Sequence, residues 1–310
     1  MPAGAPSSGR SVAVIGVPSS AGAFANGQEA APRALRAAGL IDRLRAAGAD
    51  VDDRGDSPVW RWRPDRASPR AQNLEAVIDQ VVTTRGRVGP AVREGRIALV
   101  LGGDCTVGIG TVAGVLDVHP SVALIYFDLH ADMNTPESVV DGALDWTGVA
   151  HMLALDGRER ELARAGPRVP MLRADQVVLF GHGMDQATAW ERVQIERLGL
   201  ARIPVEEVRD DADAAARRAL AQVRSRFDRY VVHLDVDVID FTDAPLSENT
   251  GRNIGLPFDS AMAALRGLLS DGGLAAVTIA ELNPAHAAAE DGLLERFAAA
   301  LAQAMGPVAT

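Results

Sequence analysis

The sequence predicts an α/β fold in which helices cover both faces of a doubly wound, mostly parallel, eight-stranded sheet. Three observations support this fold class. Short apolar runs alternate with helical patterns along the whole chain. Most of these runs are continuously hydrophobic, as strands are when helices cover both faces of their sheet. Hydrophobic residues make up 47% of the 310 residues, which is ample for a sizeable core.

The apolar runs place the strands, and the helical patterns lie between and after them. The predicted strands span residues 11–17, 49–53, 96–101, 122–127, 176–180, 202–205, 230–236 and 275–282, with 49–53 the weakest candidate. The predicted helices span roughly residues 31–48, 73–94, 105–118, 148–156, 186–199, 211–227, 257–271 and 287–305. The first helix has Pro near its first turn and Gly at its end, which is the usual asymmetry of helix termini.

The chain shows no internal repeat and no linker, so residues 11–310 are predicted to form a single domain. Residues 1–10, MPAGAPSSGR, lack the apolar core of a signal peptide and are predicted to be a disordered tail. Long loops are expected at 57–72 and 241–257. Loops of this length inside a compact domain are frequently functional.

Composition excludes several classes of function. The net charge of −10 argues against nucleic acids and anionic membranes as partners, and no apolar run is long enough to span a bilayer. One cysteine excludes an intrachain disulfide and fits a cytoplasmic location. All 31 basic residues are arginine, which excludes a Schiff-base lysine and a P-loop lysine.

Chemically active side chains follow four of the predicted strands, where an open parallel sheet forms its binding sites. They are Cys105 after the strand at 96–101, Asp128, His130 and Asp132 after 122–127, Asp235 and Asp237 near the end of 230–236, and Glu281 near the end of 275–282. The Asp-x-His-x-Asp and Asp-x-Asp spacings put alternate side chains on one side of an extended segment. Buried carboxylates so close together either shift their pKa values strongly or bind cations. Four carboxylates nominally balance two divalent ions, and oxygen and imidazole ligands suit Mn²⁺.

Plainer interpretations exist for the same residues. A single Asp-x-Asp is common in loops, and the case for metal rests on two clusters that both lie at strand ends. A buried Cys105 could be a small inert packing residue. Glu281 could accept hydrogen bonds from nearby backbone amides at the end of its strand.

Several of these motifs resemble those of the arginase/agmatinase ureohydrolases. The metal motifs correspond to Gly102-Gly103-Asp104, FDLHADMNTP (127–136) and LDVDVID (234–240), while residues 15–40 and IAELNP (279–284) match two further family patterns. The resemblance covers nearly the whole chain. It implies a three-layer αβα arginase-like fold and a homo-oligomer, either trimer or hexamer. It also implies hydrolysis of a small guanidino substrate, by a hydroxide that bridges two metal ions, to urea and an amine.

The resemblance also implies residue roles. Asp128 and Asp235 would bridge the two ions, Cys105 and Asp132 would complete the shell of one ion, and His130 and Asp237 that of the other. Glu281 would pair with the substrate guanidinium. Asp132 would also accept a hydrogen bond from the hydroxide and pass a proton to the leaving amine. Asn134 would contact the tail of the substrate.

The chain departs from the family at Cys105, where the family has a histidine ligand. A thiol binds metal only as the thiolate, and it favours softer ions such as Zn²⁺, Fe²⁺ or Co²⁺. Alternatively, Cys105 stays protonated and its ion is weakly held or absent.

A second departure lies in DGALDWTG (141–148), where the family carries Gly-Asn-x-His-Gly with a proton-shuttling histidine. Ala143 takes the position of the Asn, and Asp145 or Thr147 that of the His. His151, predicted to bind substrate, and His182 are candidate replacements, although each could be purely structural.

Asp141, also predicted to bind substrate, stands where the family often has a serine that contacts a substrate carboxylate. An acid at this position disfavours a free carboxylate unless an arginine such as Arg252 intervenes.

Together the departures make plain arginine a doubtful substrate and keep three functions open. The first is hydrolysis of a guanidino or N-hydroxyguanidino compound, which releases urea or hydroxyurea and an amine. The second is hydrolysis of a related C–N bond in a formimino compound. The third is a catalytically inactive binding or regulatory protein that kept the fold.

Overall fold

The fold is built around one parallel sheet. In the computed structural model, which describes residues 9–306, eight strands lie in the order β2-β1-β3-β8-β7-β4-β5-β6. The strands are β1 (Ser11–Gly16), β2 (Asp50–Asp56), β3 (Ile97–Leu101), β4 (Ala123–Phe127), β5 (Val177–His182), β6 (Ala201–Pro204), β7 (Tyr230–Asp235) and β8 (Leu274–Ala280). Every neighbouring pair is parallel, so the predicted α/β fold class is confirmed and the sheet is parallel throughout.

Strand β2 explains why its sequence signal is weak. It lies at one edge of the sheet, pairs only with β1, and reads DVDDRGD with no fully buried residue. Its carboxylates form ion pairs with Arg36, Arg54 and Arg96. An edge strand with one side open to solvent can carry charge, which also protects it against pairing with other chains.

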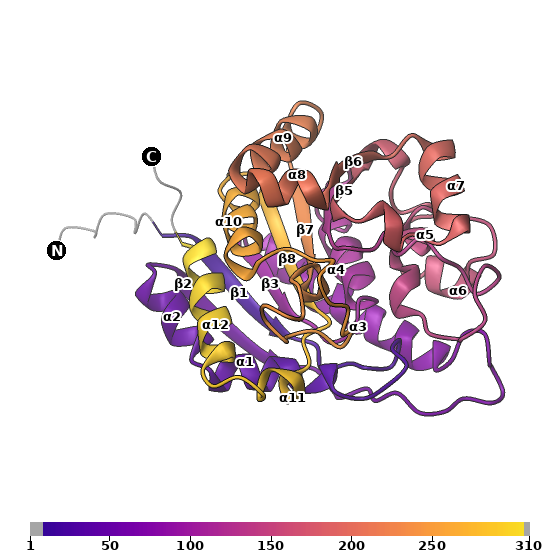
Figure 1. Cartoon of the computed structure of the whole chain (residues 1–310), viewed down its shortest axis with the longest axis horizontal. Helices are drawn as coiled ribbons and strands as arrows, with labels where there is room; N and C mark the ends of the chain where they lie inside the picture. Colours follow the sequence, from indigo (N-terminus) through magenta and orange to yellow (C-terminus); the bar gives the residue numbers. More distant parts are fainter. Residues whose placement is uncertain (1–8, 307–310) are drawn as a thin grey trace.

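Helices cover both faces of the sheet, as Figure 1 shows. On one face of the sheet, a hydrophobic cluster joins the strands to six helices. They are α1 (Ala31–Ala37), α2 (Leu40–Ala46), α8 (Val205–Asp210), α9 (Ala212–Arg224), α10 (Phe258–Leu269) and α12 (Leu293–Ala304). On the other face, a second cluster joins the strands to five helices: α3 (Leu74–Arg93), α4 (Val107–Leu116), α5 (Gly148–Met152), α6 (Arg160–Ala163) and α7 (Ala189–Leu198). The arrangement is the three-layer αβα fold that the family resemblance implies.

Local geometry accounts for the differences from the predicted helices. The expected helix at 31–48 is two helices, because Gly39 between α1 and α2 adopts a φ of 80°. Three short helices, α6, α8 and α11 (Pro284–Ala287), have no predicted counterpart. Single-turn 3₁₀ helices occur at Gln28–Ala30, Asp145–Thr147, Ala174–Gln176, Met184–Gln186 and Val236–Val238. Elements this short carry too few turns to show an apolar periodicity.

The alternation of side chains along each strand feeds both cores. In β4, Ala123, Ile125 and Phe127 belong to the first cluster, while Leu124 and Tyr126 belong to the second. Successive side chains of a strand point to opposite faces, so a strand covered on both sides must be apolar throughout. This is why the buried strands read as continuous hydrophobic runs.

The predicted tail, residues 1–10, lies outside the described residues except for its last two positions. Within residues 9–306, no helix is both long enough and apolar enough to cross a membrane.

Candidate metal centre and substrate cavity

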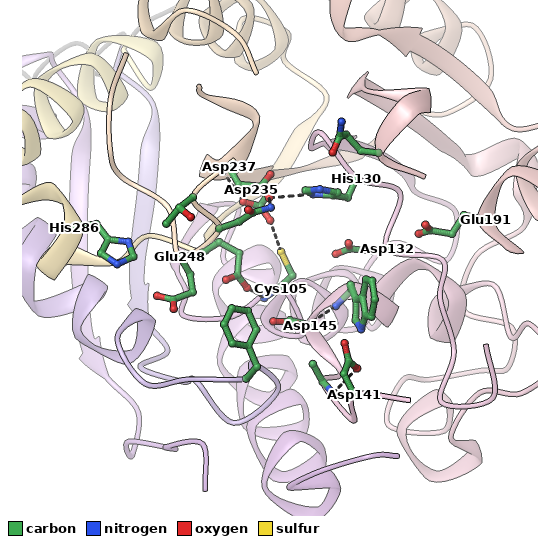
Figure 2. Close-up of a pocket in the computed structure, with 17 residues that line it drawn as sticks. Cys105, His130, Asp132, Asp141, Asp145, Glu191, Asp235, Asp237, Glu248 and His286 are labelled. Atoms are coloured by element: carbon green, nitrogen blue, oxygen red, sulfur yellow. Dashed lines mark hydrogen bonds and ion pairs between the residues drawn. The ribbon is translucent and has the colours of Figure 1, made fainter. Parts of the chain in front are cut away.

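The four strands expected to carry the site are neighbours at the centre of the sheet, in the order β3-β8-β7-β4. Their carboxyl ends face a cavity of about 620 Å³. Figure 2 shows Cys105, His130, Asp235 and Asp237 gathered on one side of it, with further acids around them. The fold therefore brings together side chains that lie more than a hundred positions apart in the sequence.

The segment after β4 supplies three of the predicted ligands. Asp128 is fully buried, and its Oδ1 accepts a hydrogen bond of 2.6 Å from the backbone N–H of His130. Asp132 adopts a φ of 48°, a left-handed conformation that is costly for a residue with a side chain. Such a conformation often marks a functional position, because the surrounding structure has to hold it.

Among the described residues, two groups of side chains have ligand atoms close enough to hold a metal ion. Cys105, Asp128 and Asp132 form the thiol-side group, and Asp128, His130 and Asp237 form the imidazole-side group. Within each group these atoms lie within 4.8 Å of one another. Asp128 belongs to both groups, as expected of a residue between two ions.

Asp235 belongs to neither group but touches both. Its Oδ2 lies 3.1 Å from the sulfur of Cys105, and its Oδ1 accepts a 2.7 Å hydrogen bond from the backbone N–H of Asp237. The bridging role expected of Asp235 therefore remains a prediction.

The loop between β3 and α4 places Cys105. A Cβ on Gly103 would lie 1.6 Å from the carbonyl oxygen of Ser19, so only glycine allows this approach of the two backbones. Asp104 is fully buried and anchors the loop by accepting hydrogen bonds from Ser19 and Thr106. Cys105 is 2% exposed, and its sulfur points toward the ligand groups.

Burial and mutual repulsion shift the pKa values of the buried carboxyls. Burial, followed by the charge of Asp237, raises the pKa of Asp128 to about 7. Burial and then Asp128 raise the pKa of Asp132 well above its usual range, and burial and then Asp237 do the same for Asp235. Asp237 differs: burial acts to raise its pKa, but His130, 3.0 Å away, outweighs it and leaves the pKa below its usual value.

The surroundings of Cys105 favour its protonated thiol. Burial raises the pKa of Cys105, and the charges of Asp235 and Asp132 raise it further. A cation between these groups would reverse the effect, because it favours the ionised forms of thiol and carboxyl alike.

Glu281 follows β8 and faces the same cavity. Its two carboxylate oxygens accept hydrogen bonds from the backbone N–H of Cys105 at 2.8 Å and from Nε2 of Gln28 at 3.0 Å. Glu281 also has a positive φ, of 62°, and burial, followed by Asp145 and Asp104, raises its pKa. The hydrogen bond from the backbone of Cys105 agrees with the plainer interpretation, in which Glu281 only accepts from nearby amides. Glu281 also lines the cavity, where its carboxylate can meet a cation.

Four residues of the divergent segment at 141–148 line the cavity: Asp141, Ala143, Asp145 and Trp146. Figure 2 shows the two acids, Asp141 and Asp145, on the same side of Cys105. Thr147 instead donates to the backbone carbonyl of Leu144 and is fully buried. Of the two residues that could occupy the position of the shuttle histidine, the structure brings only Asp145 to the cavity.

Two predicted substrate contacts are not brought to the cavity. His151 is fully buried; its Nδ1 lies 2.8 Å from the carbonyl oxygen of Thr147 and its Nε2 accepts from the backbone N–H of Glu159. Asn134 is 1% exposed, and its Oδ1 accepts hydrogen bonds from Ser138 and Thr188. Both side chains form hydrogen bonds within loops and neither lines the cavity, so substrate contact at these positions stays a prediction.

The other two candidates also lie apart from the cavity. His182, at the end of β5, lines a separate hollow beside Arg202. Arg252 places its guanidinium 4.8 Å from the ring centroid of Phe241. Neither belongs to the residues found lining the central cavity within 9–306.

Several residues of the site were not predicted from the sequence. His233 and Tyr126 contact Cys105 and Asp132, Gln28 contacts Glu281, and Glu248 and His286 line the cavity. His233 could have been noticed, because it interrupts an apolar strand two positions before Asp235. Glu248 lies in the long loop at 241–257, whose length did indicate a function.

The fold and the shared carboxylate between two ligand groups define the class of protein: a parallel α/β protein with a candidate two-ion centre at the carboxyl edge of its sheet. The model of the arginase family matches residues 10–306, and the chain belongs to this family. Its members are hydrolases that act on C–N bonds in linear amidines, depend on two Mn²⁺ ions and bind small guanidino substrates.

Individual relatives agree with this assignment. Arginase of Bacillus caldovelox is 29% identical over 288 residues, which cover 88% of this chain and 91% of that protein. Human arginase-1 is 30% identical over 279 residues, which cover 89% and 85% of the two chains. The solved structure of the B. caldovelox arginase superposes with a TM-score of 0.85 at 27% identity, covering 96% of this chain and 98% of that chain.

A more distant structural neighbour is formimidoylglutamase of Bacillus subtilis, with a TM-score of 0.72 at 17% identity. The match covers 96% of this chain and 86% of that chain. At this identity the likeness concerns the fold alone.

Proposed function

We propose that this chain hydrolyses a C–N bond of a small guanidino or N-hydroxyguanidino compound, releasing urea or hydroxyurea and an amine. The observation that carries the proposal is the position of Asp128, which belongs to two ligand groups whose other members line one cavity. Glu281 lies in the same cavity and offers a buried carboxylate to a planar cation.

The donor set fits a pair of divalent ions. Within residues 9–306, Oδ2 of Asp128 and Oδ1 of Asp237 are buried oxygens without a hydrogen-bond partner. Buried oxygens of this kind are rare unless an ion or a water satisfies them. Carboxylate and imidazole ligands suit Mn²⁺, whereas the thiol of Cys105 suits Zn²⁺, Fe²⁺ or Co²⁺. Two bound ions would lower the pKa of a shared water and so supply a hydroxide nucleophile near neutral pH.

The chain's own residues then bind the substrate and move protons. Glu281 would hold the guanidinium through charge-assisted hydrogen bonds, with Gln28 and the backbone of Cys105 fixing its orientation. Asp132 would accept the proton of the nucleophile on its Oδ1. The hydroxyl of Tyr126 donates to Oδ2 and so fixes the orientation of the carboxylate. Asp145 would take over the delivery of a proton to the leaving amine that the resemblance implies for Asp132, because burial raises the pKa of Asp145 and favours its protonated carboxyl.

The charge of the cavity selects the tail of the substrate. Among the described residues that line it, eight carry carboxylates and none is an arginine. Asp141, Asp145 and Glu248 lie beyond the ligand groups, and Arg252 is turned onto Phe241. A free carboxylate in this outer part of the cavity would meet Asp141, Asp145 and Glu248 and no arginine, so we propose a substrate tail that ends in an amine or in a neutral group.

A screen of urea and hydroxyurea release tests the proposal. Arginine, agmatine, guanidinobutyrate and N-hydroxyarginine are offered to the purified chain, with Mn²⁺, Zn²⁺, Fe²⁺ or Co²⁺ added separately. We expect agmatine, with its amine tail, to be turned over faster than arginine, and guanidinobutyrate, with only a carboxylate, to be the slowest. N-hydroxyarginine tests the N-hydroxyguanidino substrate directly, and we expect its turnover to exceed that of arginine. Two bound ions without turnover of any compound would instead support a binding protein.

The variant Glu281→Gln tests the guanidinium contact within the screen. Loss of a hydrogen bond to a charged group costs about 1.5–3 kcal/mol, which corresponds to a fall in kcat/KM of roughly 10–100-fold. Metal content should stay at the wild-type level. Glu290→Gln, at an exposed position before α12, is the matched control. An unchanged kcat/KM in Glu281→Gln would contradict the proposed role.

A further inference from the structure

His233 is a buried imidazole at the metal centre that the family motifs do not include among the ligands. It lies on β7 two positions before Asp235, so both side chains point to the same side of the strand. His233 is 1% exposed, and its Nε2 lies 3.2 Å from the sulfur of Cys105. Residues 105 and 233 are far apart in the chain, and the contact exists only because β3 and β7 both flank β8.

His233 also stacks on Tyr126. The two residues are direct partners in the register of β4 and β7, and their rings lie 4.4 Å apart at an angle of 7°. The hydroxyl of Tyr126 donates a hydrogen bond to Oδ2 of Asp132. Each ring of the stacked pair therefore holds one side chain of the thiol-side group: His233 contacts Cys105, and Tyr126 contacts Asp132.

Helix α4 leaves space for the imidazole ring at one glycine. A Cβ on Gly108 would lie 2.5 Å from Nδ1 of His233, closer than any real contact, so a larger residue there would displace the ring. In the part of the chain that the structure describes, Nδ1 has no hydrogen-bond partner. Nε2 is thus the ring nitrogen that forms a hydrogen bond, and its partner is the sulfur of Cys105.

The contacts of the sulfur indicate what His233 does. As a thiol, Cys105 can donate its proton to Oδ2 of Asp235, 3.1 Å away. When an ion binds the sulfur, that proton leaves to solvent and the sulfur can only accept. The tautomer of His233 with hydrogen on Nε2 places a donor at this sulfur.

We propose that His233 and Tyr126 form a positioning pair that holds Cys105 and Asp132 in place for one metal ion, with His233 Nε2–H donating to the Cys105 sulfur. The inference rests on the proposed two-ion function. It adds that a stacked pair of rings orients the side chains that bind the thiol-side ion. Partners of this kind fix the orientation of metal ligands, and their loss typically weakens metal binding by about 10–100-fold.

Titration of the metal-free full-length chain with Co²⁺ tests the pair, because a thiolate bound to Co²⁺ gives a sulfur-to-metal charge-transfer absorption band. Cys105→Ser identifies the band by abolishing it. His233→Leu removes the donor, whereas His233→Gln keeps an N–H group at a position close to that of Nε2. Tyr126→Phe keeps the stacked ring and removes only the hydroxyl. His119→Gln, which changes a histidine on the loop between α4 and β4, is the control for loss of an imidazole elsewhere.

We expect His233→Leu to weaken Co²⁺ binding at the sulfur by about 10–100-fold and to shift or weaken the band. His233→Gln should restore much of both, and Tyr126→Phe should weaken the same ion while the sulfur band persists. Wild-type affinity and an unaltered band in His233→Leu would overturn the inference.

Two further outcomes are decisive. If His233→Leu does not fold, wild-type Co²⁺ affinity in Tyr126→Phe overturns the pair. If the wild-type chain binds two ions and turns over substrate without a sulfur band, the pair is refuted and the proposed function stands. Failure of the wild-type chain to bind any ion would refute both.

Discussion

The thiol-side and imidazole-side groups share Asp128 but differ in their internal balance of charge. In the imidazole-side group, His130 lies 3.0 Å from Asp237, lowers the pKa of that carboxyl and is itself 26% exposed. The thiol-side group is fully buried and contains no cation of its own, so burial raises the pKa values of Cys105 and Asp132. One group is thus largely neutralised by its own imidazole, whereas the other depends on a bound ion and on the rings of His233 and Tyr126.

The largest effect is expected where the two groups overlap. Asp128→Asn removes the charge that both groups share and should weaken the binding of both ions by more than about 100-fold, beyond the loss typical of an outer partner. Metal content and titration calorimetry measure it, with Asp79→Asn on the exposed face of α3 as the control. Retention of one ion at wild-type affinity would show that the groups do not share Asp128.

Replacing the thiol should affect only one group. Cys105→His exchanges a thiolate for a neutral imidazole, which removes one negative charge from the thiol-side group. We expect preference for Mn²⁺ over Zn²⁺ to rise by about tenfold or more at that ion alone. Metal competition measured beside Cys105→Ser separates gain of an imidazole from loss of a thiol. If neither metal nor substrate preference moves, Cys105 is only a packing residue.

The dependence of stability on pH should reverse when ions bind. The unfolded carboxyl of Asp128 ionises near pH 4, but its folded pKa is about 7. A raised folded pKa contributes stability at low pH that is lost as the pH rises. The free energy of unfolding of the metal-free chain should therefore fall between pH 4 and 7, by about 1.4 kcal/mol per pH unit for this one proton.

Denaturant unfolding at several pH values, with and without divalent ions, measures this dependence. Bound ions favour the carboxylate and should abolish the fall or reverse it. Asp128→Asn should make the metal-free profile less steep by the share of this one proton, while the raised pKa values of Asp132 and Asp235 keep part of the fall. A profile that is equally steep in this variant would place the titration on another group.

The smallest effect is expected at the rim of the imidazole-side group. Nδ2 of Asn249 donates a 3.2 Å hydrogen bond to Asp237, but Asn249 is exposed to solvent. Asn249→Ala should weaken the imidazole-side ion by no more than about tenfold. The sulfur-to-Co²⁺ band, which reports the thiol side, should not change. A change of that band would mean that the two groups are coupled beyond Asp128.

Much of the fold could be predicted, because apolar continuity identified the strands and connectivity implied a parallel sheet. The candidate metal ligands were predicted by the same reasoning, since Asp128, His130 and Asp132 come directly after a buried strand. Asn134 and His151 could not be judged in this way. Both lie near the site in sequence, but the side chain of Asn134 is hydrogen-bonded to Thr188 and that of His151 to the backbone carbonyl of Thr147.

The sequence by itself determined which strands form and which side chains, Cys105 among them, stand at their ends. Local periodicity is sufficient for these statements. Only the tertiary structure decided that Cys105 meets His233 and that His233 stacks on Tyr126. Such contacts depend on strand order and register, and a shift of one residue would turn each side chain to the opposite face of the sheet.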